Sequence, residues 1–158
     1  MLSIIVLDNY PILRYGINNL LRNNFEDIQI TEVESLKDIP QFEKKIKPDL
    51  IILGINDNSR KQDLELYYAV KQFFPISPVI VYDEIIYDFK TLPYLEFGIE
   101  GYVLKQNNPS ELLRSIEIVL TGKRYICNAV LQNLYHGFLL EESGLARKQL
   151  LMNLRNQA

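Results

Sequence analysis

Five short segments, most of them nearly apolar throughout, recur along the chain at nearly even spacing, with helix-like segments between them. The five apolar segments are 3–7 (SIIVL), 28–33 (IQITEV), 50–53 (LIIL), 78–82 (PVIVY) and 101–104 (GYVL). A strand that is covered on both faces is apolar throughout, so these runs are typical of a parallel sheet between two layers of helices. The strict alternation of strand and helix predicts an α/β fold, with a doubly wound five-stranded parallel sheet and right-handed crossovers.

The connecting segments show helical periodicity of unequal quality. The clearest helix is predicted over 108–120, which opens on Asn-Pro-Ser-Glu, a capping residue followed by a first-turn proline and a capping-box glutamate. The other predicted helices are 11–22, 35–46, 62–74 and 84–97. Pro40 and Pro93 lie inside two of these, so those two helices are expected to be short, kinked or late in starting.

The tail of the chain follows a different pattern, which divides the sequence into a domain over 1–122 and a helical tail or linker over 123–158. A tail helix is predicted from about 128 to 140, and the sequence EESG at 141–144 indicates a break before a second helix. One stripe of the first tail helix is apolar, with Leu131, Leu134, Tyr135 and Phe138. Such a stripe must be covered, either by the chain's own domain or by another subunit. We expect a homodimer through the tail or through the last helix of the domain.

The composition argues against several classes of function. Seventeen basic and 20 acidic residues give a net charge of −3, which is unlike an autonomous nucleic-acid binder. No apolar run approaches the roughly 18 residues needed to span a bilayer, so no membrane association is expected. One cysteine, Cys127, and one histidine, His136, argue against a zinc site or a Cys/His catalytic pair. A lone cysteine also fits a reducing, cytoplasmic compartment.

In a doubly wound sheet the functional crevice lies beyond the carboxyl ends of the strands. The residues expected at these ends are Asp8, Asn9, Gly54, Ile55, Asn56, Asp83 and Lys105. The third apolar run reaches this edge at Gly54, a residue with no side chain to present there.

Four separated segments carry a resemblance to a known family in their order, spacing and composition. They are IIVLDNYPILRYGINNLL, KPDLIILGIN, SPVIVYD and FGIEGYVLKQNNPSELLRSIEIVLTGKRY. Over about residues 1–125 the chain resembles the receiver domain of LuxR-type (NarL/FixJ class) bacterial response regulators. The resemblance implies the (βα)5 receiver, or flavodoxin-like, fold. It also implies a magnesium ion held by carboxylates, a phosphorylated aspartate, a hydroxyl residue and a lysine around the phosphoryl group.

Only part of that set is present in this chain. Asp8 matches the first acidic position, but Asn9 stands at the second, which is usually the direct metal ligand. Gly54 stands at the phosphoacceptor position and Asp83 at the hydroxyl position, whereas Lys105 is kept.

Two further positions follow from the same resemblance. Tyr102 matches the aromatic switch position, and Asn56 matches a residue that ligates metal through its backbone carbonyl.

These replacements predict a pseudo-receiver with a degenerate phosphoacceptor pocket, no metal and no cofactor, and no enzymatic activity. Gly54 has no atom that could attack a phosphoryl donor, and the remaining carboxylates leave little charge for tight Mg²⁺ binding. We expect Lys105 to pair with Asp8 or with Asp83. The alternative is three solvated charges around a decayed cleft.

The expected function is a phosphorylation-independent signalling module of the two-component, response-regulator type, which acts by protein–protein contact in transcription regulation. Only 37 residues follow Thr121, too few for the four-helix DNA-binding domain of LuxR-type regulators, so DNA would be reached only through an output domain outside these residues. Two alternatives stay open. One is a phosphorylatable receiver with a non-standard acceptor such as Asp57 or Asp83, and the other is a ligand sensor that uses a pocket widened at Gly54.

Overall fold

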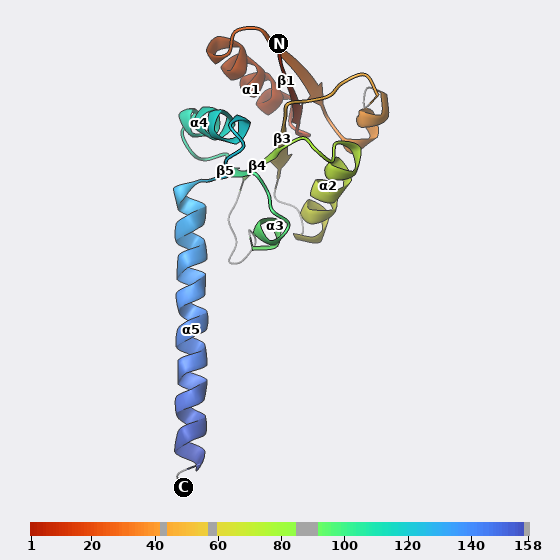
Figure 1. The fold of residues 1–158 in the computed structure, drawn as a ribbon. Helices are drawn as coiled ribbons and strands as arrows, with labels where there is room; N and C mark the ends of the chain where they lie inside the picture. Colours follow the sequence, from red (N-terminus) through yellow and green to blue (C-terminus); the bar gives the residue numbers. More distant parts are fainter. Residues whose placement is uncertain (42–43, 57–59, 85–91, 157–158) are drawn as a thin grey trace.

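A single parallel sheet organises the molecule, and helices cover both of its faces (Figure 1). The computed structural model describes residues 1–41, 44–56, 60–84 and 92–156. The strand order is β2-β1-β3-β4-β5-β6, with every pairing parallel. The strands are β1 (Leu2–Leu7), β2 (Ile28–Val33), β3 (Leu50–Ile55), β4 (Val79–Asp83), β5 (Gly101–Leu104) and β6 (Tyr125–Ile126). The predicted fold class is confirmed.

Two apolar cores lie on the two faces of this sheet, because neighbouring residues of a strand point to opposite sides. Ile4 and Val6 of β1 join a core with α1 (Pro11–Asn24) and α4 (Pro109–Leu120). Ile5 and Leu7 join the core on the other face, which includes residues of α2 (Arg60–Phe73) and α3 (Leu92–Glu96). The residues of β3, β4 and β5 are therefore buried on both sides, as their continuous apolar runs indicated.

The sheet has six strands, so the prediction of five is wrong by one. β6 extends the sheet beyond β5, with Gly101 paired to Tyr125 and Tyr102 paired to Ile126. A strand of two residues is too short to carry a period of its own, and the tail sequence around it suggested only a linker. The division of the chain near residue 122 stays a prediction, although the residues just after it complete this sheet.

The two predicted helices that contain a proline differ from regular long α-helices in the part of the chain that the structure describes. The segment predicted as a helix over 35–46 forms a 3₁₀ helix, η1 (Leu36–Gln41), with Pro40 inside it. A proline that lacks an N–H and clashes with the preceding turn does not allow a long α-helix there. Within the predicted helix over 84–97, the structure places α3 at Leu92–Glu96, and residues 85–91 lie outside the described part of the chain.

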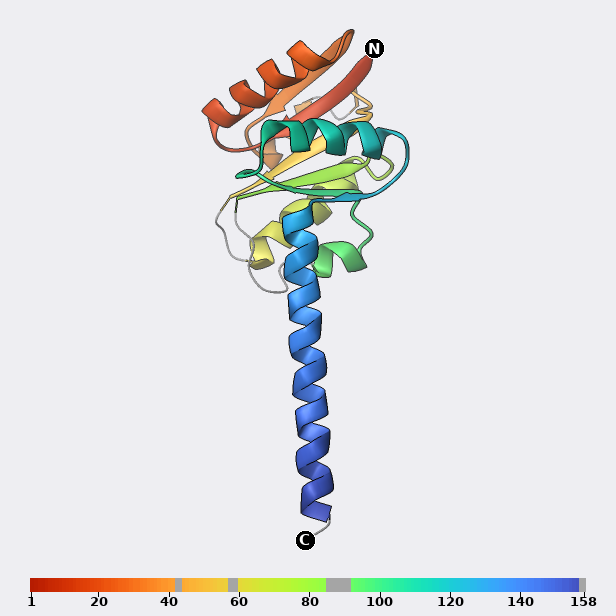
Figure 2. The same cartoon turned by 90° about the vertical axis from the view of Figure 1, so that its left-hand side faces the viewer.

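The tail forms one continuous helix, α5 (Asn128–Asn156), of 29 residues, which is about 44 Å long at 1.5 Å per residue. The predicted break at 141–144 is therefore wrong: the helix passes through it, and the Ser143 hydroxyl donates to the Leu139 carbonyl at 2.6 Å. Figures 1 and 2 show α5 leaving the edge of the sheet and extending away from the domain. Val130, in its first turn, is fully buried in the domain core. Among the described residues, no helix has the length and apolar character needed to cross a membrane.

Candidate functional site

The residues predicted for the site lie together at the carboxyl edge of the sheet. Asp8 directly follows β1, and Lys105 directly follows β5. Gly54 lies within β3 opposite Tyr82 of β4, one pair before Ile55 and Asp83. The backbone N–H of Lys105 donates to the Asp83 carbonyl at 2.7 Å, which continues the sheet pairing up to the site.

An ion pair between Asp8 and Lys105 occupies the centre of the site. The Lys105 Nζ lies 2.7 Å from Asp8 Oδ2, and these side chains are 10% and 1% exposed. The same ammonium donates to Asn56 Oδ1 at 2.6 Å and lies 5.9 Å from the centre of the Tyr10 ring. Of the two partners considered for Lys105, the structure places Asp8 against it. A buried pair of this kind is screened much less by solvent than a surface pair.

The carboxylate of Asp8 also has a second set of partners. Its Oδ1 accepts from the backbone N–H of Tyr10 at 2.8 Å and from the Asn56 amide at 3.4 Å. The Asn56 amide further donates to Asn9 Oδ1. Both carboxylate oxygens of Asp8 are therefore engaged, and Asn9 and Asn56 face each other as neutral amides.

The missing side chain of Gly54 is what makes room for Asp8. A Cβ built on Gly54 would lie 2.5 Å from Asp8 Cγ and 2.8 Å from Asp8 Cβ, and closer still to Oδ2. Both distances are shorter than carbon–carbon contacts in proteins allow. Asp8 therefore fills the space that any side chain at position 54 would need.

A pocket of about 300 Å³ lies near Gly54 on the side of η1 and α2, where Leu7, Leu36 and Leu66 contribute to its lining. Strand alternation directs a Cβ at position 54 to the opposite side, the side of Asp8. The expected widening at Gly54 is thus filled by Asp8 on one face, while the pocket on the other face has a largely apolar wall.

The donor set does not fit a magnesium ion. Mg²⁺ binds through carboxylate, carbonyl and water oxygens in near-octahedral geometry. In the described part of the pocket, the carboxylate of Asp8 has its Oδ2 already paired with an ammonium group. Within the part of the chain that the structure describes, no group of three or more His, Cys, Asp or Glu residues is placed to hold a metal ion.

Tyr102 and Asp83 form a second buried pair beside the first. The Tyr102 hydroxyl donates to Asp83 Oδ2, and both residues are fully buried. The Tyr102 ring also packs edge-on against Tyr94, with 5.6 Å between the ring centres. Burial first, and then the charge of Asp83, raises the pKa of Tyr102 far above its usual value. The predicted switch aromatic is therefore held inside the domain as a neutral donor.

Two further residues touch the site: Arg14, which the sequence analysis missed, and Tyr10, whose ring was expected only to pack. Arg14 of α1 donates from Nη1 to the Asp8 carbonyl at 2.5 Å, and its Nε lies 3.7 Å from Glu32. Tyr10 places its ring beside Lys105 and its N–H on Asp8. The sequence signal for Arg14 was its place in the first turn of the helix that follows Asp8.

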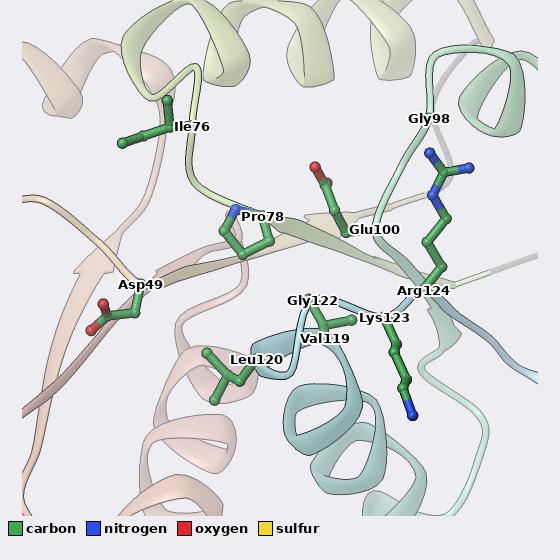
Figure 3. Close-up of a pocket in the computed structure, with 10 residues that line it drawn as sticks. All are labelled: Asp49, Ile76, Pro78, Gly98, Glu100, Val119, Leu120, Gly122, Lys123 and Arg124. Atoms are coloured by element: carbon green, nitrogen blue, oxygen red, sulfur yellow. The ribbon is translucent and has the colours of Figure 1, made fainter.

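Another pocket, of about 530 Å³, lies at the opposite edge of the sheet, where the strands begin (Figure 3). Two acidic residues of its lining already have partners. Asp49 accepts from the Ser3 backbone at 2.8 Å, and Glu100 accepts from the Val79 backbone at 3.0 Å. The pocket contains none of the residues predicted for the functional site.

A parallel sheet of this strand order, with the site at the carboxyl ends of β1, β3 and β5, defines the class: the domain has the receiver fold. A LuxR-family DNA-binding response regulator from Silicibacter pomeroyi superposes with a TM-score of 0.69 at 22% identity, over 82% of this chain and 98% of that one. The isolated REC domain of RcsB from Salmonella enterica serovar Typhimurium gives 0.74 at 24% identity, over 84% and 98%.

The sequence comparisons agree with the fold. The transcriptional regulatory protein DegU of Brevibacillus brevis is 24% identical over 133 residues, which are 84% of this chain and 56% of that protein. The nitrate/nitrite response regulator protein NarL of Escherichia coli K12 is 22% identical over 128 residues, which are 81% and 59%. No family model matches the chain. The homologues are thus response regulators of the LuxR/NarL class, as the four sequence segments indicated, and the chain spans less than 60% of the length of these two.

Proposed function

We propose that the chain is a cytoplasmic, receiver-like signalling module that acts by protein–protein contact in transcription regulation and needs no phosphorylation of its pocket. The observation that carries this proposal is the carboxylate of Asp8, which lies in the space beside Gly54 and pairs with Lys105. The lysine that would neutralise a phosphoryl group already has an internal anion as its partner.

This pocket supplies few of the groups that a phosphoryl transfer needs. The transfer needs a nucleophile, and Gly54 supplies none. It also needs a cation at the developing charge, whereas the donor set does not fit Mg²⁺ and Lys105 is occupied. The Tyr102–Asp83 hydrogen bond supports the same proposal, because turning Tyr102 outward would remove the donor from a buried carboxylate.

The proposed partners are proteins. Solved structures of RcsB include a complex with DNA and two dimers bound to two parallel DNAs, and these findings belong to RcsB. For this chain we propose a homodimer through α5 or α4. DNA contact by these residues is not part of the proposal, because their net charge is −3 and a basic surface is what duplex binding requires.

Intact-mass measurement after incubation with acetyl phosphate and Mg²⁺ tests the proposal. We expect no phosphoryl adduct, while a receiver with an aspartate at the acceptor position, treated in parallel, gains one. An adduct would instead support a non-standard acceptor. Comparing Asp83→Asn with Asp57→Asn would then locate it; Asp57 lies outside the described residues.

A ligand sensor is the second candidate, and the pocket of about 300 Å³ beside Gly54 supports it. A small molecule that binds only the folded state must raise the melting temperature. A thermal-shift screen of small anions and metabolites therefore tests this candidate. A hit whose shift disappears in Leu66→Trp, which fills the pocket, would favour it over the contact module.

A further inference from the structure

The part of α5 beyond its first turns exposes large apolar side chains in a regular row. Leu131, Phe138, Leu145 and Met152 are seven residues apart, and between 49% and 66% of each is exposed. In both views α5 extends away from the domain, so the domain does not cover this row (Figures 1 and 2). We call these four residues the apolar row. An exposed row of this length on one helix is typical of a surface that another helix covers.

A second row runs beside the apolar row with the same period. Leu134, Glu141, Lys148 and Arg155 are also seven residues apart, each three positions after a member of the apolar row. We call Glu141, Lys148 and Arg155 the charged row; Leu134 packs against the domain core. Positions that alternate by three and four residues are the a and d positions of a coiled coil, which are apolar in most coiled coils. Here the apolar row supplies one of these positions and the charged row the other, so the charges lie in the seam. A strict seven-residue period also predicts a left-handed supercoil.

The charges in this seam decide between the two directions of pairing. If two copies of α5 paired in parallel and in register, each Glu141 would face the partner's Glu141 and each Lys148 the partner's Lys148. Like charges at facing seam positions oppose association. If the helices run antiparallel about a centre at residue 143, the a positions of one helix face the d positions of the other, and each Glu141 lies one core layer from the partner's Lys148. Opposite charges then meet twice, once on each side of the centre.

Two other features fit an antiparallel pair with this centre. Gly144 lies one residue from the centre, and no atom lies within 4 Å of a Cβ built on it. A glycine costs about 1 kcal/mol inside a helix relative to alanine. Small residues allow two helix backbones to approach closely. The overlap of residues 131–155 is about 38 Å long, which places the two domains at opposite ends of the helix pair.

We propose that α5 pairs with α5 of a second copy of this chain, antiparallel and centred near Gly144, through the apolar and charged rows. This inference rests on the proposed function as a contact module and names the partner and the surface. The dimer holds its two receiver-like domains apart, at the two ends of a helical rod. The α4 faces of the domains are then left open for other partners.

Charge reversal in the full-length chain tests the proposal, with the dissociation constant measured by sedimentation equilibrium. Lys148→Glu brings Glu141 next to a glutamate on both sides of the centre, and we expect the dimer to weaken about tenfold or more. The double variant Glu141→Lys with Lys148→Glu exchanges the charges and restores the wild-type dimer. The matched control is Arg147→Glu, an identical charge change on the neighbouring residue, which lies outside both rows and leaves the dimer unchanged.

Each other outcome overturns the proposal. In a parallel dimer the facing charges are alike in the wild type and stay alike in every variant, so Lys148→Glu would cause no marked loss for the double variant to restore. A dimer that ignores Lys148→Glu is therefore parallel or uses another surface. A wild-type chain that is monomeric at all concentrations has no such helix pair. The proposal that the pocket needs no phosphorylation would then still be tested separately, by the intact-mass measurement.

Discussion

The Asp8 side chain lies where a side chain at position 54 would have to lie. The residue type at each of these positions therefore restricts the residue type at the other. The Asp8 carboxylate needs the space beside a residue without a Cβ, and in that space it reaches Lys105. In a sequence comparison with a working receiver the two positions are independent: the acidic residue is kept at Asp8, and the phosphoacceptor is lost at Gly54. The structure makes them one unit, and their energetic coupling can be measured.

Gly54→Ala should destabilise the fold by about 1–3 kcal/mol, because the new methyl group overlaps Asp8 in a well-packed core. Urea unfolding measures the loss. The control is Gly16→Ala in α1, where a Cβ meets no atom within 4 Å and alanine should stabilise the helix by up to about 1 kcal/mol. In the double variant with Asp8→Ala the overlap with Oδ2 and Cγ is gone and only the contact of 2.8 Å with Cβ remains. The double variant should therefore lose less stability than the sum of the two single losses. Full additivity would contradict the shared volume.

Lys105→Met should cost about 3 kcal/mol in the free energy of unfolding, because it leaves the buried Asp8 carboxylate without its cation. Lys123→Met, at an exposed lysine, is the matched control and should change stability by less than about 0.5 kcal/mol. Equal stability of the two variants would mean that the pair contributes no more than a surface pair.

Tyr94→Phe should increase stability, and the gain should grow at alkaline pH. The Tyr94 hydroxyl is buried, and no hydrogen-bond partner for it exists among the residues described. Burial, followed by the charges of Asp63 and Asp83, raises the pKa of Tyr94 well above its usual value of 10. The unfolded chain therefore loses this proton first, and native stability falls as pH rises above about 10, by about 1.4 kcal/mol per pH unit for each such tyrosine.

Urea unfolding at pH 8, 10 and 11 checks this prediction. The gain from Tyr94→Phe should be largest at the highest pH, whereas Tyr135→Phe, at an exposed position on α5, should show the same small effect at each pH. A gain that does not change with pH would argue that the tyrosine ionises as easily in the folded chain as in the unfolded one.

Among helices and strands, the sequence predicted those whose residue pattern reflects which side chains are buried. The five central strands and α1, α2 and α4 followed from apolar runs and helical spacing, since both reflect which face meets the core. β6 was missed because two residues carry no period. The continuity of α5 was missed because serine and glycine inside EESG are typical of loops, although such propensities are weak where the flanking residues favour a helix. The Asp8–Lys105 pair was one of two expected arrangements. In the structure Asp8 lies beside Gly54 within reach of Lys105, whereas Asp83 accepts from Tyr102, and neither contact can be read from the sequence.

The first turn of α5 packs into the core of the domain, and the substitution Val130→Ala tests this. Val130 is fully buried with Tyr102 and Ile99 in one cluster, so the truncation should cost about 2 kcal/mol. Leu151→Ala, at a residue of the same helix that is 54% exposed, removes more apolar surface and should cost much less at a concentration where the chain is monomeric. If both substitutions had the same effect, the helix would be anchored elsewhere.

On the scale of the whole molecule, stability and assembly are linked through α5. A dimer that exists only in the folded state makes the melting temperature depend on protein concentration. We expect the melting temperature to rise as the chain is concentrated over about a hundredfold range, and the rise should disappear in Lys148→Glu. A melting temperature that is independent of concentration in the wild-type chain would contradict assembly through this helix.

The overlap at Gly54 also limits the order in which this sequence can change. A single substitution that returns an aspartate to position 54 places its Cβ against Asp8, so it loses fold stability before it gains a nucleophile. A series of single substitutions that avoids this overlap replaces Asp8 first, and that replacement removes the carboxylate that pairs with Lys105. A lineage that carries this pair therefore reaches an acidic residue at position 54 only through a less stable intermediate.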